Sequence, residues 1–130
     1  AAGLRGLGRP LRILDCGCGA SYLTIAAHHY LNDVLKVPAD VLGVDVNEDV
    51  IRKSVAKAGG LGGGPAFACR PIGGDDPADV VLALHACDTA TDDALAQAVR
   101  SGARLVLSVP CCHHHLNGRV SADGPAAVLR

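Results

Sequence analysis

The feature of this sequence that most restricts its fold is an apolar segment that runs directly into a glycine-rich turn. Residues 11–15, Leu-Arg-Ile-Leu-Asp, are followed by Cys-Gly-Cys-Gly and then by a segment with helical periodicity. Gly17 and Gly19 allow a sharp turn and a close approach of the backbone to a ligand, because a Cβ would restrict φ and fill the space. The unit predicts a strand, a turn and a helix, with a ligand at the carboxyl end of the strand.

Apolar and amphipathic segments alternate along the rest of the chain. Helical spacing begins at Ser21, a candidate N-cap, and stops before Pro38. Continuous apolar strands that alternate with helices indicate a parallel sheet covered on both faces, and right-handed crossovers limit it to a doubly wound α/β topology. The expected strands are residues 11–15, 41–46, 65–70, 80–84 and 105–109, and the expected helices are residues 21–35, 48–58 and 91–101.

The composition fits one domain of 130 residues with 49% hydrophobic content. We expect a leader at residues 1–10, a folded core at 11–116 and a polar tail at 117–130. The last apolar strand would be an unprotected sheet edge. We therefore expect that the sheet counted here is incomplete at its C-terminal end and that the natural protein continues beyond Arg130.

Two acidic residues mark the edge where parallel strands end. Asp15 closes the first strand and Asp45 closes the second, while Tyr22 stands where the dinucleotide pattern G-x-G-x-x-G requires its third glycine. A carboxylate at position 15 is a poor neighbour for a pyrophosphate but suits a cationic amino group. The carboxylate of Asp45 can accept hydrogen bonds from both hydroxyls of a ribose.

These residues carry a resemblance to a known family. The segments LDCGCG and VLGVDVNEDVI, within residues 11–52, resemble the first two motifs of class I S-adenosylmethionine-dependent methyltransferases. The resemblance implies a Rossmann-like methyltransferase core with S-adenosyl-L-methionine as cofactor. It places Asp15 near the methionine end of the cofactor, the two glycines beneath it and Asp45 at its ribose. The implied cofactor-binding residues are Asp15, Cys16, Gly17, Gly19, Asp45, Val46 and Ile72.

The adenine end of the expected site follows the third strand. Ile72 fills the apolar position that the family places there, whereas Pro71 stands where the family has an acidic residue. Asp75 or Asp76 could replace that acidic residue, but we interpret both as solvated loop residues.

The most distinctive segments are ALHACDTATD at residues 83–92 and VPCCHH at residues 109–114. They resemble a subgroup of methyltransferase-like proteins and are similar to eukaryotic tRNA acceptor-stem ribose 2′-O-methyltransferases. The resemblance implies methyl transfer to an unidentified acceptor, with RNA ribose or base among the candidates. His85 is the first candidate for a general base or substrate-orienting group and His113 the second, because imidazole titrates near neutral pH. An alternative for His85 is a histidine that orders its loop without touching substrate.

Histidine and cysteine side chains at adjacent strand ends also raise the question of zinc. Adjacent cysteines in an extended chain point to opposite faces, no C-x₂-C pair is present, and Cys87 replaces the glutamate that the zinc deaminase pattern requires. We therefore predict no metal. The candidates weighed are His85, Cys87, Cys111, Cys112 and His113.

Charge and hydropathy exclude some partners. Twelve basic against 13 acidic residues give a net charge of −1, with no basic cluster for nucleic acid or an anionic membrane, so RNA would be bound through regions outside this chain. No apolar run approaches the roughly 20 residues that span a bilayer. The six cysteines lie on or next to expected strand ends, which indicates a reducing, cytoplasmic location.

Two other functions remain open. One is a non-catalytic or degenerate methyltransferase-fold module that binds a partner. The other is an NAD(P)-dependent oxidoreductase that uses the same turn and Asp45.

Overall fold

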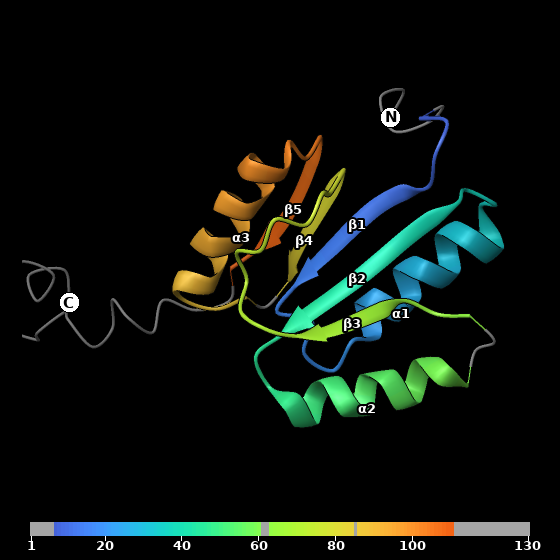
Figure 1. The fold of residues 1–130 in the computed structure, drawn as a ribbon, viewed down its shortest axis with the longest axis horizontal. Coiled ribbons are helices and arrows are strands. Elements are labelled where there is room, and N and C mark those ends of the chain that lie inside the picture. The colour runs from blue at the N-terminus through green and yellow to red at the C-terminus, as the bar shows by residue number, and fades with distance from the viewer. Residues whose placement is uncertain (1–6, 61–62, 85, 111–130) are drawn as a thin grey trace, which may run out of the picture.

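A five-stranded parallel sheet forms the centre of the computed structural model, which describes residues 7–60, 63–84 and 86–110 (Figure 1). The strand order across the sheet is β3-β2-β1-β4-β5. The chain forms the central strand β1 first, adds β2 and β3 outward to one edge, and then crosses back to add β4 and β5 on the other side. This confirms the expected doubly wound, Rossmann-like sheet. The strands are β1 (Leu11–Cys16), β2 (Ala39–Asp45), β3 (Ala66–Cys69), β4 (Val80–Leu84) and β5 (Leu105–Val109).

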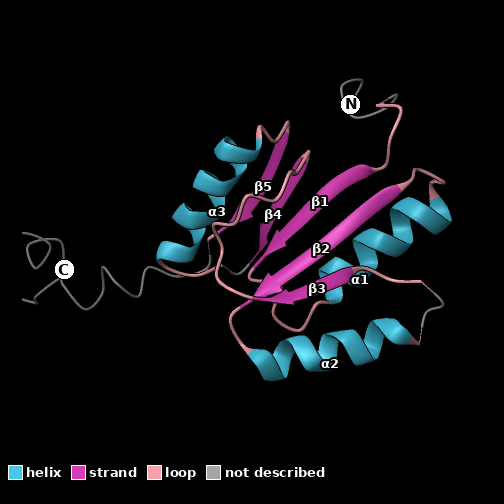
Figure 2. Ribbon diagram, in the orientation of Figure 1, coloured by secondary structure: helices cyan, strands magenta, loops and turns pink. Residues whose placement is uncertain are grey.

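Three α-helices connect the strands and cover the sheet (Figure 2). They are α1 (Tyr22–His29), α2 (Glu48–Gly59) and α3 (Thr89–Ser101). Successive residues of β1 belong to different apolar clusters, because successive strand side chains point to opposite faces. Ile13 packs in the cluster that includes Leu23 of α1, and Leu14 packs in the cluster that includes Ala94 of α3. Helices therefore lie on both faces.

The cluster beneath α3 consists largely of small side chains. Ala83, Ala94 and Ala98 are each 3% exposed or less, and Cys16 and Val81 are fully buried. Such side chains let the helix approach the sheet closely, so dense packing of small residues forms the core of a chain that has only two Tyr and one Phe.

The expected first helix differs in detail from the observed one. It is α-helical to His29 and continues as a five-residue π-helical turn, Tyr30–Val34. Ser21 occupies the N-cap position, but its φ is +62° and its side chain makes no capping hydrogen bond. Its hydroxyl instead lies 2.6 Å from the hydroxyl of Ser54 in α2, so a contact between helices replaces the local cap.

Other boundaries shift by one or two residues, as helix and strand ends commonly do. α3 begins at Thr89, two residues before the expected start, and β2 begins at Ala39 and ends at Asp45. None of the helices in the described ranges is long and apolar enough to cross a membrane.

A buried carboxylate joins the starting ends of three strands. The Asp79 carboxylate accepts hydrogen bonds from both Nη atoms of Arg9, each at 2.7 Å, and from the backbone N–H of Arg12 at 2.9 Å. The Asp79 carbonyl accepts from the N–H groups of Arg104 and Leu105, which lead into β5. These bonds, above all those from Arg9, hold the pKa of Asp79 well below its usual range, although burial opposes them.

The residues just before β1 therefore take part in the fold. Leu7 packs against the α1-side cluster, and Arg9 pairs with Asp79. The boundary between a leader and the core at residue 10 stays a prediction.

Replacing Asp79 by Asn is expected to lower the free energy of unfolding at pH 7, because the neutral amide cannot pair with both arginines. A carboxylate whose pKa is lower in the folded than in the unfolded protein stabilises the fold at pH values above its unfolded pKa of about 3.9. This stabilisation is lost as the pH falls toward the folded pKa. The difference between wild type and Asp79→Asn in urea denaturation should therefore shrink below about pH 4. Asp40→Asn, at an exposed position of β2, is the matched control. A deficit that is equal at every pH would contradict the charge-based explanation.

Candidate functional site

The turn after β1 has the backbone conformation expected of its glycines. Gly17 and Gly19 have φ values of +69° and +50°, which L-residues with a Cβ rarely adopt. A Cβ on Gly17 would lie 3.8 Å from the nearest atom, so conformation rather than crowding requires glycine there. The N–H groups of Gly17 and Cys18 both donate to the carbonyl of Val44, at 2.9 and 3.0 Å. The turn is thus attached to the end of β2.

The Asp45 carboxylate connects this turn to the start of α2. Its Oδ2 accepts from the Gly19 N–H at 3.0 Å, and its Oδ1 accepts from the Asn47 N–H at 2.9 Å. Asn47 in turn caps α2, since its side chain accepts from two backbone N–H groups of the first turn. A carboxylate has about four lone-pair directions, so each oxygen of Asp45 can still accept one hydroxyl. This geometry suits a ligand diol held beside the glycine turn.

Asp15 lies on β1 beneath the turn and is 2% exposed. Its Oδ2 accepts a 2.6 Å hydrogen bond from the Thr24 hydroxyl of α1. Burial raises the pKa of Asp15, the Thr24 hydrogen bond lowers it, and the charge of Asp45 raises it. The ionised form is therefore costly here and would gain from a nearby cation. Direct contact between Asp15 and a ligand stays a prediction.

The remaining candidate residues divide into buried and exposed ones. Cys16 is fully buried, and burial raises the pKa of its thiol to about 12, so its side chain is a neutral packing group. Val46, just after β2, is 72% exposed. Ile72, in the loop from β3 to β4, is half-buried and packs against the cluster that contains Cys16 and Val44. Among these described candidate residues, Val46 and Ile72 are the ones whose apolar side chains can contact a ligand at this edge.

One interpretation of the β3–β4 loop was wrong. Asp76 is not a plain solvated residue, because it forms an ion pair with Arg70, with the two side chains 30% and 28% exposed. Asp75 is exposed, as expected. Both members of the pair affect the pKa of the Cys16 thiol, so their charges act close to the glycine turn.

Both histidines predicted for catalysis, His85 and His113, lie outside the described residues, as do Cys111 and Cys112. In sequence, position 85 directly follows β4, whose carboxyl end is at the same sheet edge as Asp15 and Asp45. Within the described part of the chain, no group of three or more His, Cys, Asp or Glu side chains could hold a metal ion.

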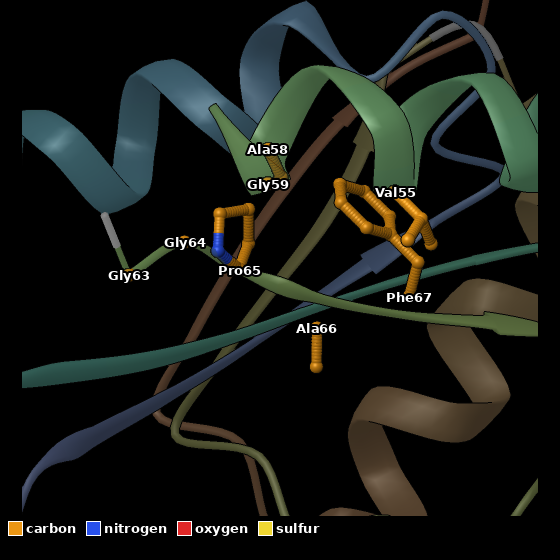
Figure 3. A pocket seen from close by; sticks show the side chains of 8 residues that line it. All are labelled: Val55, Ala58, Gly59, Gly63, Gly64, Pro65, Ala66 and Phe67. Atoms are coloured by element: carbon orange, nitrogen blue, oxygen red, sulfur yellow. The ribbon is translucent and has the colours of Figure 1, made fainter. Parts of the chain in front are cut away.

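Two hollows in the described surface do not include the candidate residues at this edge. One, of about 360 Å³, lies between α2 and the segment entering β3, where the Phe67 ring lies beside Val55 (Figure 3). Another, of about 660 Å³, is lined by residues of α1 and of the π-helical turn that follows it, together with Lys57 of α2 and Gly63. Neither contains Asp15, Asp45 or the glycine turn, so the candidate site is defined by its chemistry and not by the size of a cavity.

Comparison with known proteins now gives the family. A family model described as a methyltransferase domain matches residues 5–119. The chain belongs to the methyltransferase domain family. No curated protein matches the sequence.

Solved structures show the same fold in larger proteins. Magnesium protoporphyrin IX methyltransferase from Synechocystis PCC 6803, solved with bound SAM, is 24% identical with a TM-score of 0.52 over 75% of this chain and 49% of its own. The CMeT domain of the citrinin polyketide synthase is 20% identical with a TM-score of 0.52 over 74% of this chain and 27% of its own. This methyltransferase domain thus spans about half of one matched chain and about a quarter of the other.

Sequence reasoning missed two residues that shape the site of this methyltransferase domain. Gly43 in β2 lies opposite Phe67 in β3, and a Cβ on it would lie 2.9 Å from the Phe67 ring and 3.0 Å from the Cys18 sulfur. An isolated glycine within a strand was the available signal, since it often marks such a close approach. Thr24 had no comparable signal, because its partner Asp15 is known only from the packing of α1 on β1.

Replacing Thr24 by Val is expected to destabilise the domain by about 1.5–3 kcal/mol at neutral pH, the usual contribution of a hydrogen bond to a charged group. Removal of this donor would raise the pKa of Asp15 further, so the deficit relative to wild type should grow as pH rises through that pKa. Urea denaturation over a pH series measures this difference in the free energy of unfolding between wild type and Thr24→Val. Thr24→Ser keeps the hydroxyl and should behave as wild type; an equal loss in Thr24→Ser would contradict the hydrogen-bond explanation.

Proposed function

We propose that this methyltransferase domain binds S-adenosyl-L-methionine at the carboxyl edge of its sheet and transfers the methyl group to an acceptor. The observation that carries the proposal is the Asp45 carboxylate, bonded to Gly19 of the positive-φ turn and retaining free lone pairs. In this assignment the ribose hydroxyls donate to Asp45, the cofactor passes over Gly17 and Gly19, and Val46 and Ile72 contact the adenine. Cys16 contributes backbone, because its thiol is buried.

The charges at this edge support a cationic cofactor. S-adenosylmethionine carries a sulfonium and an ammonium group, which would stabilise the ionised Asp15 that burial disfavours. The pyrophosphate of NAD(P) is anionic and would be repelled by the carboxylate of Asp15, and Tyr22 stands where the dinucleotide pattern has its third glycine. The oxidoreductase alternative is therefore the weaker one.

Methyl transfer is an in-line displacement at a sulfonium carbon. The acceptor atom forms a bond to the methyl carbon, the carbon–sulfur bond breaks, and S-adenosylhomocysteine leaves as a neutral thioether. The protein mainly aligns the two reactants and excludes water. A hydroxyl acceptor must also lose its proton, and we assign this role first to His85 and second to His113.

For the acceptor we propose RNA, at a ribose or a base. The support is the similarity of the H-x-C element at residues 85–87 and the C-C-H-H element at residues 111–114 to tRNA ribose methyltransferases. The net charge of −1 gives this segment little attraction for phosphates, so further regions or a partner would supply basic residues. A cytoplasmic location is part of the same proposal.

Calorimetric titration with S-adenosylmethionine and S-adenosylhomocysteine tests the cofactor. Asp45→Ala should weaken both by at least about tenfold, because it removes a charge-assisted acceptor worth about 1.5–3 kcal/mol. Asp40→Ala, at the opposite end of β2, is the matched control and should bind as wild type. Absence of binding by wild type would overturn the cofactor assignment, and quenching or enhancement of NADH fluorescence would support the oxidoreductase.

The catalytic assignment predicts a separation of binding from transfer. His85→Ala should keep the affinity for S-adenosylmethionine within about twofold but lower methyl incorporation into RNA about 10²-fold, the usual contribution of a general base. The rate of methyl incorporation is measured as the transfer of radiolabelled methyl groups into a pool of cellular RNA. An equal loss of cofactor binding would favour the loop-ordering alternative for His85, and no incorporation by the wild-type domain together with the regions that bind RNA would contradict RNA as the acceptor.

A further inference from the structure

An ion pair between two of its own residues closes the loop between β3 and β4, residues 70–79. Arg70 at its start and Asp76 form an ion pair through Nη2 and Oδ2. Each side chain is less than one-third exposed, so the pair is more shielded from water than a typical surface ion pair. Five residues of the loop, Pro71 to Asp75, lie between Arg70 and Asp76.

Two further hydrogen bonds attach the closed loop to its surroundings. The backbone N–H of Arg70 donates to the carbonyl of Asp45 at 2.9 Å. On the other side, Nε2 of Gln97 in α3 donates to the carbonyl of Asp76 at 3.4 Å. Gln97 is 1% exposed, and its Oε1 accepts from Arg100 at 3.2 Å. The loop thus provides the hydrogen-bond acceptor for the buried side-chain amide N–H of Gln97.

The loop sequence is adapted to the ion pair. A Cβ on Gly74 would lie 2.8 Å from Nη1 of Arg70 and 2.8 Å from Oδ2 of Asp76. Both atoms are ends of flexible side chains, so a side chain at position 74 would displace the ion pair while leaving the backbone free of clashes. Gly73, with φ of +118°, makes the loop conformation available at the cost of backbone entropy.

This loop borders the proposed cofactor site. Its Ile72 packs against the cluster that contains Cys16 and Val44, the strand residues beside the glycine turn. The charges of Arg70 and Asp76 reach the Cys16 thiol, and the Arg70 N–H is bonded to the backbone of Asp45, the proposed ribose ligand.

We infer that Arg70, Asp76 and Gln97 form a clasp that positions the β3–β4 loop as the wall of the adenosine end of the cofactor pocket. The inference rests on the proposed function. A loop with two adjacent glycines would otherwise have to be ordered when the ligand binds, and that cost would weaken the affinity. The clasp residues act through the loop and need not touch the cofactor.

Charge exchange tests the clasp. Arg70→Asp and Asp76→Arg should each weaken binding of S-adenosylhomocysteine about tenfold, and the double exchange should recover affinity to within about threefold of wild type. Gly74→Ala, which displaces the pair with little change of surface, should weaken binding in the same direction and serves if a charge variant fails to fold. Arg52→Asp, in the exposed Arg52–Asp49 pair of α2, is the matched control and should bind as wild type.

A second ligand shows which end of the cofactor the clasp variants affect. 5′-Methylthioadenosine keeps the adenosine and lacks the amino-acid end, so the clasp variants should weaken it by the same factor as S-adenosylhomocysteine. Single variants that bind as wild type, a double exchange without recovery, or a loss confined to S-adenosylhomocysteine would each overturn the clasp. Failure of wild type to bind either ligand would instead contradict the proposed function.

Discussion

The candidate site depends on one bridge, the Asp45 carboxylate between the Gly19 and Asn47 N–H groups. Because β1 and β2 are parallel and Cys16 lies opposite Val44, their following turns meet at the same edge. The bridge fixes the glycine turn relative to the N-terminus of α2, and the Arg70 N–H adds the end of β3 to the same residue. Three consecutive strand ends are therefore held together by the side chain and backbone of one residue.

The two edges of the sheet use buried carboxylates in opposite ways. At the starting edge, arginines lower the pKa of Asp79, so its charge stabilises the fold. At the carboxyl edge, burial raises the pKa of Asp15 and a single hydroxyl from Thr24 compensates in part. A cation can stabilise a buried charge that is costly on its own, so in the proposed function this edge would give up stability in favour of binding.

The sequence predicted those features of the fold that depend on local residue patterns. Apolar runs gave five strands, and the glycine spacing gave the positive φ angles of Gly17 and Gly19. It did not predict the partners of Ser21 or Asp76, because Ser54 and Arg70 reach them only through the packing of other elements. Asp76 lies in a loop rich in Gly, Asp and Pro, a composition that ordinarily indicates a solvated turn, so nothing local distinguished it from Asp75.

Rigidity at the cofactor edge has a consequence for the reaction. The turns after β1, β2 and β3 are held by hydrogen bonds and an ion pair within the described residues, before any ligand is present. Binding energy is then not needed to order them, and the methyl group can be presented in a fixed direction. In the proposed assignment of His85 and His113, the acceptor would approach that methyl group from the side of the residues that follow β4 and β5 in sequence. Specificity for the acceptor would then belong to a different part of the chain from affinity for the cofactor, and substitutions in the two parts should separate the two properties.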